Sequence, residues 1–313
     1  MKIIDLNTKK EYALSPQDRI SCAIGNFDGV HLGHRALISL AAKKQKAITK
    51  SAVWTFSEPS SRQLGGVSLL SAPAERYEIF RMLGIELLFL TDFEDVRSLS
   101  PEAFAKEILF EACHVRNAVC GFNFRYGNMA SGDALTLKKD MNALGADVSI
   151  VEPFCLNGTV VSSSAIRDAL TAGNPELAAD MLSRPYSITA PVVHGKKLGR
   201  TLGFPTAHQH FPKGRIIPKF GVYAVRLYTE DGCYNGVANV GIRPTVEHTP
   251  VANCETFIFD FQGDLYGKTV RTEFCAFLRP EQPFSDVISL KTAVHNDIAN
   301  ARLYFQTERK NTL

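Results

Sequence analysis

The sequence has little net charge and no long run of charge of one sign. Its 35 lysine and arginine residues nearly balance its 32 aspartate and glutamate residues, which leaves a formal net charge of +3 at pH 7. Non-specific binding of nucleic acid relies on a strongly basic surface, and this composition does not provide one. We therefore expect no nucleic-acid partner.

The sequence also lacks the cysteine patterns of metal centres and disulfide frameworks. Its 7 cysteines are scattered and odd in number, and none stands in a CxxC pair or a Cys/His cluster. Such usage indicates reduced, mostly buried thiols, as in cytoplasmic proteins.

Long hydrophobic runs are absent as well. Residues 1–12 contain no apolar stretch typical of a signal peptide, and the run 85–90 is short and contains Glu86. A membrane-spanning helix needs about 20 predominantly apolar residues. We therefore expect a cytoplasmic protein without a membrane partner.

The motif GxxxxGK[ST] of P-loop nucleotide-binding proteins does not occur either. Its absence excludes a P-loop kinase as the source of any phosphoryl transfer.

The chain does contain enough apolar residues to build buried cores. Hydrophobic residues make up 45% of it and aromatic residues 10%, and its 313 residues are more than one ordinary compact domain needs. The composition changes after Gly173, where β-branched and aromatic runs punctuated by glycine and proline replace helix-like segments. We place the domain boundary shortly after this change, near residues 182–186, which gives domains 1–183 and 184–313.

In the first half, strand-like and helix-like segments alternate. This alternation predicts a doubly wound, Rossmann-like α/β domain, in which helices cover both faces of a parallel sheet. Such sheets bind ligands beyond the carboxyl ends of their strands. The expected strands are 21–24, 52–56, 87–90, 118–120 and 148–151, and the expected helices are 32–46, 73–83, 101–113 and 134–144.

In the second half, short strands with frequent turns predict a small antiparallel barrel or sandwich. A short helix, 175–182, precedes it, and an amphipathic helix, 287–305, closes the chain from an N-cap at Ser285 or Asp286. The expected strands are 188–193, 221–228, 234–240, 255–259 and 269–278.

The densest motif is GNFDGVHLGH at residues 25–34, between a predicted strand and a predicted helix. Unpaired N–H groups and the helix dipole stabilise an anion at a helix N-terminus, and Gly25 and Gly29 let the backbone approach a phosphate. His31 and His34 are one helical turn apart, so both rings can stabilise charge that develops on an attacked phosphate. The alternative is a glycine-rich turn with two exposed histidines, but the strand–motif–helix context favours the phosphate site.

This motif resembles the HxGH signature of the nucleotidylyltransferase superfamily, and its FDGVHLGH form resembles the FAD synthetase branch. The resemblance implies that His31 and His34 are catalytic and that the loop before them binds ATP. The implied ATP-binding residues of the loop are Gly25, Asn26, Phe27, Asp28 and Gly29.

Residues 121–127, GFNFRYG, resemble the flavin-side loop of the same family. The resemblance implies that Asn123, Phe124 and Arg125 bind flavin. From the residues alone, Arg125 fits an ordinary surface ion pair equally well.

Residues 162–167, SSSAIR, resemble the second phosphate-binding element of the family, with Ser164 and Arg167 as the implied contacts. From the residues alone, the serines fit an N-cap cluster that opens a helix. Arg167, one turn into that helix, can still reach a phosphate.

The segment HGKKLGRTLGFPT at residues 194–206 is rich in glycine and cations, as a flexible flap over phosphates would be. By itself it fits a basic hairpin loop equally well. Together with GVY at 221–223, NVGIRPT at 239–245 and the surroundings of Glu255, it resembles the riboflavin kinase domain.

That second resemblance implies a small antiparallel barrel that phosphorylates riboflavin with Mg²⁺–ATP. Glu255 matches the glutamate that takes the proton from the riboflavin 5′-hydroxyl, a role that suits a carboxylate because an alcohol is a weak nucleophile. The alternative for Glu255 is an exposed strand residue. The other implied contacts are Gly195, Lys196, Gly199 and Arg200 for phosphates, Arg279 and Phe284 for flavin, and Thr206 and His208 for the metal.

Three positions depart from the family patterns. The adenylyltransferase branch usually has Thr-Phe-x-Pro-His-Pro after the second strand, where residues 55–60 read TFSEPS without a histidine. Riboflavin kinases usually read Pro-Thr-Ala-Asn where this chain has His208, and they usually have histidine at the position of Phe257. An imidazole is a poorer partner for Mg²⁺ than an amide oxygen, so the departures bear more on the kinase reaction.

Both resemblances together imply a bifunctional enzyme of FAD synthesis that uses Mg²⁺ and ATP twice. Riboflavin becomes FMN in the second domain, and FMN and ATP become FAD and pyrophosphate in the first. Two alternatives remain: an FMN adenylyltransferase whose second domain binds flavin without phosphorylating it, and a non-catalytic flavin-binding regulator. The expected partners are the small molecules riboflavin, FMN and ATP.

Overall fold

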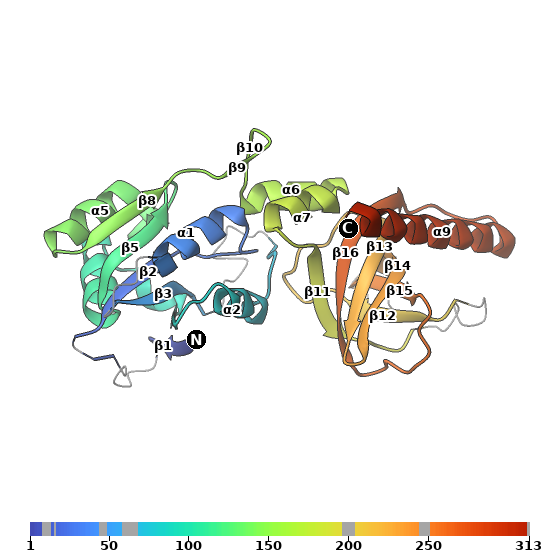
Figure 1. The fold of residues 1–313 in the computed structure, drawn as a ribbon, viewed down its shortest axis with the longest axis horizontal. Helices are drawn as coiled ribbons and strands as arrows, with labels where there is room; N and C mark the ends of the chain where they lie inside the picture. The colour runs from blue at the N-terminus through green and yellow to red at the C-terminus, as the bar shows by residue number, and fades with distance from the viewer. Residues whose placement is uncertain are drawn as a thin grey trace. The chain divides into compact units, whose positions relative to one another are not determined.

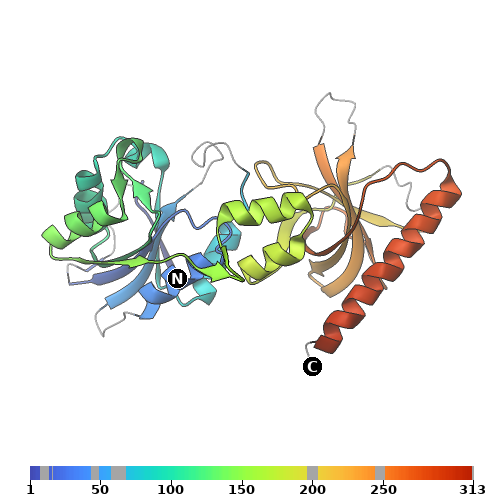
Figure 2. The ribbon, with the colours of Figure 1, turned by 90° about the horizontal axis from the view of Figure 1, so that it is seen from above.

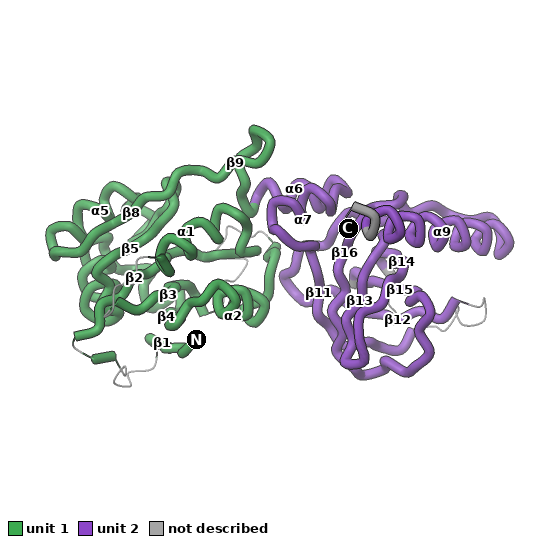
Figure 3. Tube along the Cα trace, in the orientation of Figure 1, with its two compact units in different colours: residues 1–163 green, residues 164–313 purple. Residues whose placement is uncertain are grey.

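The computed structural model describes residues 1–7, 14–15, 17–43, 49–57, 68–195, 204–243 and 251–311. The chain forms two compact units, residues 1–163 and 164–313, which are coloured separately in Figure 3. Each unit has its own sheet and its own buried core.

The first unit is built on a six-stranded sheet with the order β1-β4-β3-β2-β5-β8 (Figure 1). Every neighbouring pair in it is parallel. The strands are β1 (Lys2–Asp5), β2 (Arg19–Ile24), β3 (Thr49–Phe56), β4 (Leu87–Thr91), β5 (Val115–Gly121) and β8 (Asp147–Val151).

Helices cover both faces of this sheet, as the alternating sequence pattern predicts. The helical elements are α1 (Leu32–Lys43), α2 (Pro73–Met82), α3 (Phe93–Val96), α4 (Pro101–Ala103), η1 (Phe104–Ala112), η2 (Asn128–Ala130) and α5 (Ala134–Ala143). On one face, α1 and α2 bury Ile38 and Phe80 in a shared core. On the other face, η1 and α5 bury Leu109 and Met141 in a second core. The doubly wound fold is therefore confirmed.

Some elements of this unit were not predicted. β1 pairs with β4 at the edge of the sheet. Two short antiparallel hairpins are added, β6 (Arg125–Tyr126) with β7 (Gly132–Asp133) and β9 (Cys155–Leu156) with β10 (Thr159–Val160). The helix expected over 101–113 becomes a π-helix in η1, which ends where the Cys113 amide donates to the carbonyl of Ile108, five residues back.

The second unit contains a six-stranded antiparallel sheet with the order β11-β16-β13-β14-β15-β12. The sheet curls so that its edge strands β11 and β12 contact each other. The strands are β11 (Tyr186–Pro191), β12 (Thr206–His210), β13 (Gly221–Thr229), β14 (Gly232–Arg243), β15 (Val251–Ile258) and β16 (Thr269–Pro280).

A buried glutamine ties the two edges of this barrel together. The Gln209 side chain on β12 donates to the carbonyls of Ala190 on β11 and Val270 on β16, at 3.0 and 2.9 Å. Its own amide oxygen accepts from the hydroxyl of Thr272 at 2.5 Å. Because a buried amide must find partners, this network fixes the position of β12, which the polar sequence of that strand did not predict.

In the part of the second unit that the structure describes, three helices accompany the barrel. They are α6 (Ser163–Ala172), α7 (Pro175–Leu182) and α9 (Val287–Asn311). α9, the red helix at the C-terminal end of the chain in Figure 2, packs along β13, β14 and β16. It buries Ala301 and Phe305 there. It starts after Asp286, whose carboxylate accepts the amide hydrogen of Ser289 at 2.7 Å, so the predicted cap at Asp286 is confirmed.

The predicted boundary between residues 183 and 184 stays a prediction. The two compact units divide at Ser163 and Ser164, and α7 contacts β11 and β16 of the barrel. The short helix that the sequence placed with the first domain thus packs within the second unit.

Candidate active sites

The motif at residues 25–34 lies at the point where the winding of the first sheet changes direction. The chain leaves β2 through α1 to β3, whereas β5 is added on the opposite side of β2 (Figure 1). Doubly wound sheets bind their ligands at the carboxyl ends of the strands at this position.

The loop itself has a strained backbone. Phe27 and Val30 are buried and adopt positive φ values of 50° and 42°, which non-glycine residues rarely do, and Gly29 has a φ of 82°. Conformations of this kind cost of order 1–3 kcal/mol each and cluster at functional sites. A Cβ on Gly25 would lie 3.3 Å from the Phe27 ring, so Gly25 makes room for that ring.

His31 and His34 stack face to face, with 3.6 Å between ring centroids and 18° between ring planes. The backbone N–H of His34 donates to Nδ1 of His31 at 3.3 Å, so a neutral His31 carries its proton on Nε2 and can donate from there. Burial lowers the pKa of His34 well below its ordinary value of 6.5, and the nearby charges of His31 and Arg76 lower it further. His34 is therefore neutral at neutral pH.

A buried cation lies against the same loop. Arg76 of α2 is 0% exposed, and its Nη1 donates to the carbonyl of Asn26 at 2.7 Å. The hydroxyl of Thr55 at the end of β3 donates to the same carbonyl at 3.3 Å. Burial lowers the pKa of Arg76, and among the described residues its Nε and Nη2 have no hydrogen-bond partner.

The side chain of Asp28 binds backbone amides of the segment before α2. Its buried carboxylate accepts from the backbone amides of Leu70 and Ser71, at 2.9 and 3.1 Å. The Ser71 hydroxyl accepts in turn from the amide of Gly29 at 2.8 Å. These bonds hold the loop in shape, and the predicted role of Asp28 in binding ATP stays a prediction.

The predicted flavin-side residues follow β5, the strand next to β2, at the same carboxyl edge of the sheet. Phe124 stacks on Tyr126 with 5.5 Å between centroids. Arg125 is exposed and pairs with Asp133 at 3.6 Å, which is the surface ion pair that the sequence left open. Asn123 lies close to Gly121, with its Oδ1 3.3 Å from where a Cβ on that glycine would be.

The predicted phosphate contacts Ser164 and Arg167 lie on α6, in the second unit. The residue before them, Ser163, donates its hydroxyl to the carbonyl of Asp28 at 3.0 Å. Both residues of this hydrogen bond lie in the first unit, and the roles of Ser164 and Arg167 stay predictions.

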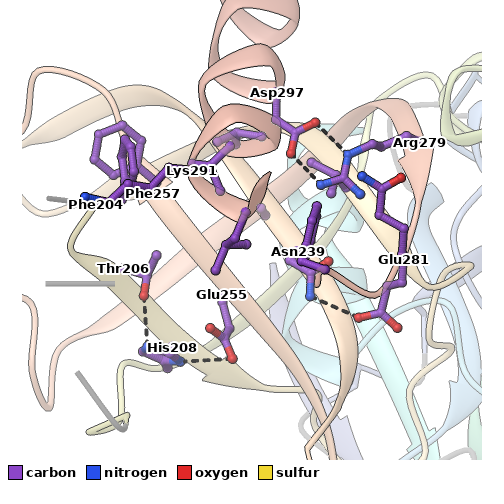
Figure 4. A pocket seen from close by; sticks show the side chains of 17 residues that line it. Phe204, Thr206, His208, Asn239, Glu255, Phe257, Arg279, Glu281, Lys291 and Asp297 are labelled. Carbon is purple, nitrogen blue, oxygen red and sulfur yellow. Dashed lines mark hydrogen bonds and ion pairs between the residues drawn. The ribbon is translucent and has the colours of Figure 1, made fainter. Parts of the chain in front are cut away.

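The second unit has a cavity of about 300 Å³ between the barrel strands and α9 (Figure 4). Its size is within the range of small-molecule sites, which is about 300–1,000 Å³. Glu255 and Asn239 line it from β15 and β14, and Arg279 and Phe284 line it from the end of β16 and the segment that follows. The predicted base and the predicted flavin contacts thus lie in one cavity.

Arg279 is held rigidly in that cavity. Its Nε and Nη2 donate to the two carboxylate oxygens of the buried Asp297 on α9, at 2.8 and 2.7 Å (Figure 4). Its guanidinium also lies over the ring of Phe284, 5.8 Å from the centroid. A paired, stacked guanidinium presents a flat, fixed surface to a ligand.

A second cavity of about 510 Å³ adjoins the first. Thr206, His208 and Phe257 line both cavities, while Gly195 and residues 260–266 line the second alone. A Cβ on Gly195 would lie 2.5 Å from Nε2 of His208, so only glycine fits against that ring. The other predicted phosphate contacts, Lys196, Gly199 and Arg200, lie outside the described residues, as does Glu58 in the stretch that lacks the family histidine.

Side chains of β12 and β15 meet on the wall that the cavities share. His208 and Glu255 are directly opposite each other in the strand pairing, and Thr206 is opposite Phe257. His208 Nε2 lies 2.9 Å from the hydroxyl of Thr206, and its Nδ1 lies 3.7 Å from Oε1 of Glu255 (Figure 4). The alternative of an exposed strand residue therefore does not describe Glu255.

Two residues that support the sites were not predicted from the sequence, although a sequence pattern could have identified each. Arg76 lies three and four residues before the buried Ile79 and Phe80, so it lies on the apolar face of its helix. Asn253 lies two residues before Glu255 and shares its face of the strand.

A doubly wound α/β unit with two stacked histidines at its ligand-binding edge, and a small barrel with two adjoining cavities, fit a two-domain transferase. The family model described as riboflavin kinase matches residues 182–305, and the one described as FAD synthetase matches residues 14–165.

Whole-chain relatives agree with this division. A bifunctional riboflavin kinase/FMN adenylyltransferase of Bacillus subtilis (strain 168) is 35% identical over 319 residues, which cover 99% of this chain and 100% of the relative. The protein of the same name from Escherichia coli (strain K12) is 33% identical over 299 residues, covering 93% of this chain and 94% of the relative. A crystal structure of a macrolide-efflux protein from Streptococcus pneumoniae is 31% identical with a TM-score of 0.82, covering 94% of this chain and 97% of that chain.

The chain belongs to the family of bifunctional riboflavin kinase/FMN adenylyltransferases. It is an enzyme of FAD biosynthesis that makes FMN from riboflavin and FAD from FMN, and the main functional prediction from the sequence is confirmed. Within the described ranges, none of the helices is long and apolar enough to cross a membrane.

Proposed function

We propose that riboflavin is phosphorylated where the two cavities of the second unit meet. The observation that carries this proposal is the shared wall of Thr206, His208 and Phe257, with Glu255 in the first cavity. Riboflavin in the first cavity and ATP in the second would bring the 5′-hydroxyl and the γ-phosphate together at this wall. Glu255 accepts the hydroxyl proton as the oxygen attacks the γ-phosphorus, and ADP leaves.

Two fixed side chains hold the flavin in this proposal. Arg279 and Phe284 form a flat surface in the first cavity, which suits a planar ring system. Gly195, with Lys196, Gly199 and Arg200 from the glycine-rich segment, contacts the phosphates of ATP.

ATP enters as its Mg²⁺ complex. The Thr206 hydroxyl is the type of oxygen ligand that Mg²⁺ prefers, and phosphates and waters complete its shell. The bound ion would neutralise charge on the transferred phosphoryl group. His208 fits a metal less well because its two ring nitrogens lie 2.9 Å from Thr206 Oγ1 and 3.7 Å from Glu255 Oε1, and its role as a metal ligand stays a prediction.

We further propose that FMN is adenylylated at the stacked pair His31 and His34. The strained loop of Gly25, Asn26, Phe27, Asp28 and Gly29 places the phosphates of ATP at the N-terminus of α1, where the helix dipole favours an anion. The two histidines stabilise the charge that develops at the α-phosphate as the FMN phosphate attacks and pyrophosphate leaves. Ser164 and Arg167 bind phosphate, and Asn123, Phe124 and Arg125 bind flavin.

We also expect the protein to act in the cytoplasm. All 7 cysteines are free, and burial raises the pKa of the Cys22, Cys113 and Cys254 thiols, which keeps them unreactive. Buried thiols of this kind fit a reducing compartment.

Two variants test the division of labour between the sites. His31→Ala combined with His34→Ala should lower the rate of FAD formation from supplied FMN at least about tenfold, which is about 1.4 kcal/mol of barrier. Glu255→Gln keeps the shape of the side chain but removes the base, so the kinase turnover should fall by about 10²–10⁴-fold.

Each variant is the control for the other, because each should leave the opposite reaction unchanged. Wild-type FAD formation by the double histidine variant would overturn the first assignment. Wild-type phosphorylation by Glu255→Gln would mean that another group accepts the proton.

A further inference from the structure

Asn253 directly contacts the carboxylate of Glu255. The two residues are on β15 and share one face of the sheet, because alternate residues of a strand point the same way. Asn253 Nδ2 donates to Glu255 Oε1 at 2.8 Å. On the neighbouring strand β12, His208 places its Nδ1 3.7 Å from the same oxygen.

The chemistry of this contact fixes which end of the amide faces the glutamate. An ionised carboxylate only accepts hydrogen bonds, so Asn253 must present its NH₂ group and not its oxygen. Asn253 is 3% exposed, and its Oδ1 has no hydrogen-bond partner among the described residues. An unpaired buried acceptor lowers stability. Stability alone therefore does not explain why an asparagine occupies this position.

A carboxylate acts more effectively as a general base when its orientation is fixed. A glutamate side chain has several rotatable bonds, and an oxygen held by a buried amide fixes the plane of the carboxylate. The direction in which its second oxygen accepts a proton is then fixed as well. When the orientation is fixed before the reaction, the entropic part of the activation free energy is smaller.

We propose that Asn253 is a positioning residue for the kinase reaction, which holds the Glu255 carboxylate beside His208 in the orientation that accepts the riboflavin 5′-hydroxyl proton. This inference rests on the proposed role of Glu255 as the base. Asn253 acts through Glu255 and touches neither substrate.

A double-mutant cycle on the full chain tests this proposal. Asn253→Ala should lower kcat for riboflavin phosphorylation about tenfold and change KM for riboflavin by less than about twofold, because orientation and not binding is lost. In the Glu255→Gln background, the same substitution should change kcat by less than about twofold, since no base remains to be positioned. A residue with a merely structural role would cause the same loss in both backgrounds.

Two controls accompany the cycle. Asn235→Ala, on β14 and outside the lining of both cavities, should leave kcat unchanged. FAD formation from supplied FMN, which belongs to the other unit, should be unchanged in every variant, and urea unfolding of each variant reports whether the barrel is intact. If Asn253→Ala does not fold, Asn253→Ser replaces it, because the serine oxygen is one bond shorter and does not reach Oε1.

Equal losses in the two backgrounds, or an unchanged kcat in Asn253→Ala, would overturn the positioning role while leaving Glu255 as the base. A wild-type kcat in Glu255→Gln alone would instead overturn the proposed function of Glu255, and the positioning role with it.

Discussion

At the residue scale, the side chains of the two sites match the nucleophiles that they serve. The phosphate of FMN is already an anion, so its attack on ATP needs stabilisation of charge and no base. In our proposal, the rings of His31 and His34 stabilise this charge in the first site. The 5′-hydroxyl of riboflavin must lose a proton, and the proposed acceptor in the second site is the carboxylate of Glu255.

The pH dependence of His34 follows from its burial. Its pKa in the folded protein lies well below 6.5, so the unfolded chain takes up the proton first as the pH falls. Because of His34, the free energy of unfolding should therefore decrease as the pH drops below about 6.5. Nuclear magnetic resonance titration of the His34 ring should give a pKa below that value.

The matched control is His34→Gln, which keeps a polar side chain but does not titrate. Urea unfolding between about pH 7.5 and about pH 5.5, a range that brackets the reference value, should show a smaller loss of stability for this variant. An ordinary or raised pKa for His34 would contradict its burial beside His31 and Arg76.

At the scale of elements, periodicity predicted most of the first unit. The helix at 32–46 was predicted because its apolar residues repeat at helical spacing, and the helix at 73–83 was predicted to end before Gly84. Their observed bounds are Leu32–Lys43 and Pro73–Met82. β12 was missed because its sequence, TAHQH, is polar and is held by the side-chain network of Gln209. Long-range contacts of this kind leave no local pattern in a sequence.

Prediction of the two sites from the sequence has the same limit, because long-range contacts cannot be predicted from local patterns. The motifs point to His31, His34 and Glu255 as the reactive groups, because side chains of these types suit the chemistry of each reaction, and their roles stay predictions. The supports around them, Arg76 and Asn253, depend on which helix or strand packs beside the motif, and this is a property of the fold.

The close packing of Gly195 against His208 gives a prediction at this scale. A Cβ at residue 195 would lie 2.5 Å from Nε2 of that ring, so Gly195→Ala must displace the ring or the backbone. Because His208 lies between Thr206 and Glu255, kinase turnover should fall about tenfold or more.

The combination with His208→Ala is the control for this prediction. It removes the ring that the new methyl group meets, so adding Gly195→Ala to His208→Ala should cause little further loss. Additive losses in steady-state phosphorylation assays would show that Gly195 acts through the phosphates and not through His208.

At the scale of the whole molecule, each reaction is assigned to a unit with its own core. The family models end at residue 165 and begin again at residue 182, and α7 lies between them. α7 nevertheless packs on β11 and β16, with Ala178, Met181 and Leu182 buried.

Two truncated proteins, one beginning at the predicted domain boundary and one at the observed boundary between the units, test whether α7 stabilises the barrel. Residues 184–313 should fold and phosphorylate riboflavin, because the barrel and α9 contain both cavities. Residues 164–313 should be more stable by roughly 2–5 kcal/mol, because α7 covers apolar surface of the barrel. Urea unfolding measures this difference, and equal stability would show that α7 contributes nothing to the barrel.

The most direct test of the account is to follow the products of the whole protein. The purified chain is incubated with riboflavin, ATP and Mg²⁺, and riboflavin, FMN and FAD are separated by chromatography over time. The account predicts that FMN forms first and FAD follows, each at the expense of ATP. FAD formed only from supplied FMN would contradict the kinase assignment of the second unit, and the absence of both products would contradict the account as a whole.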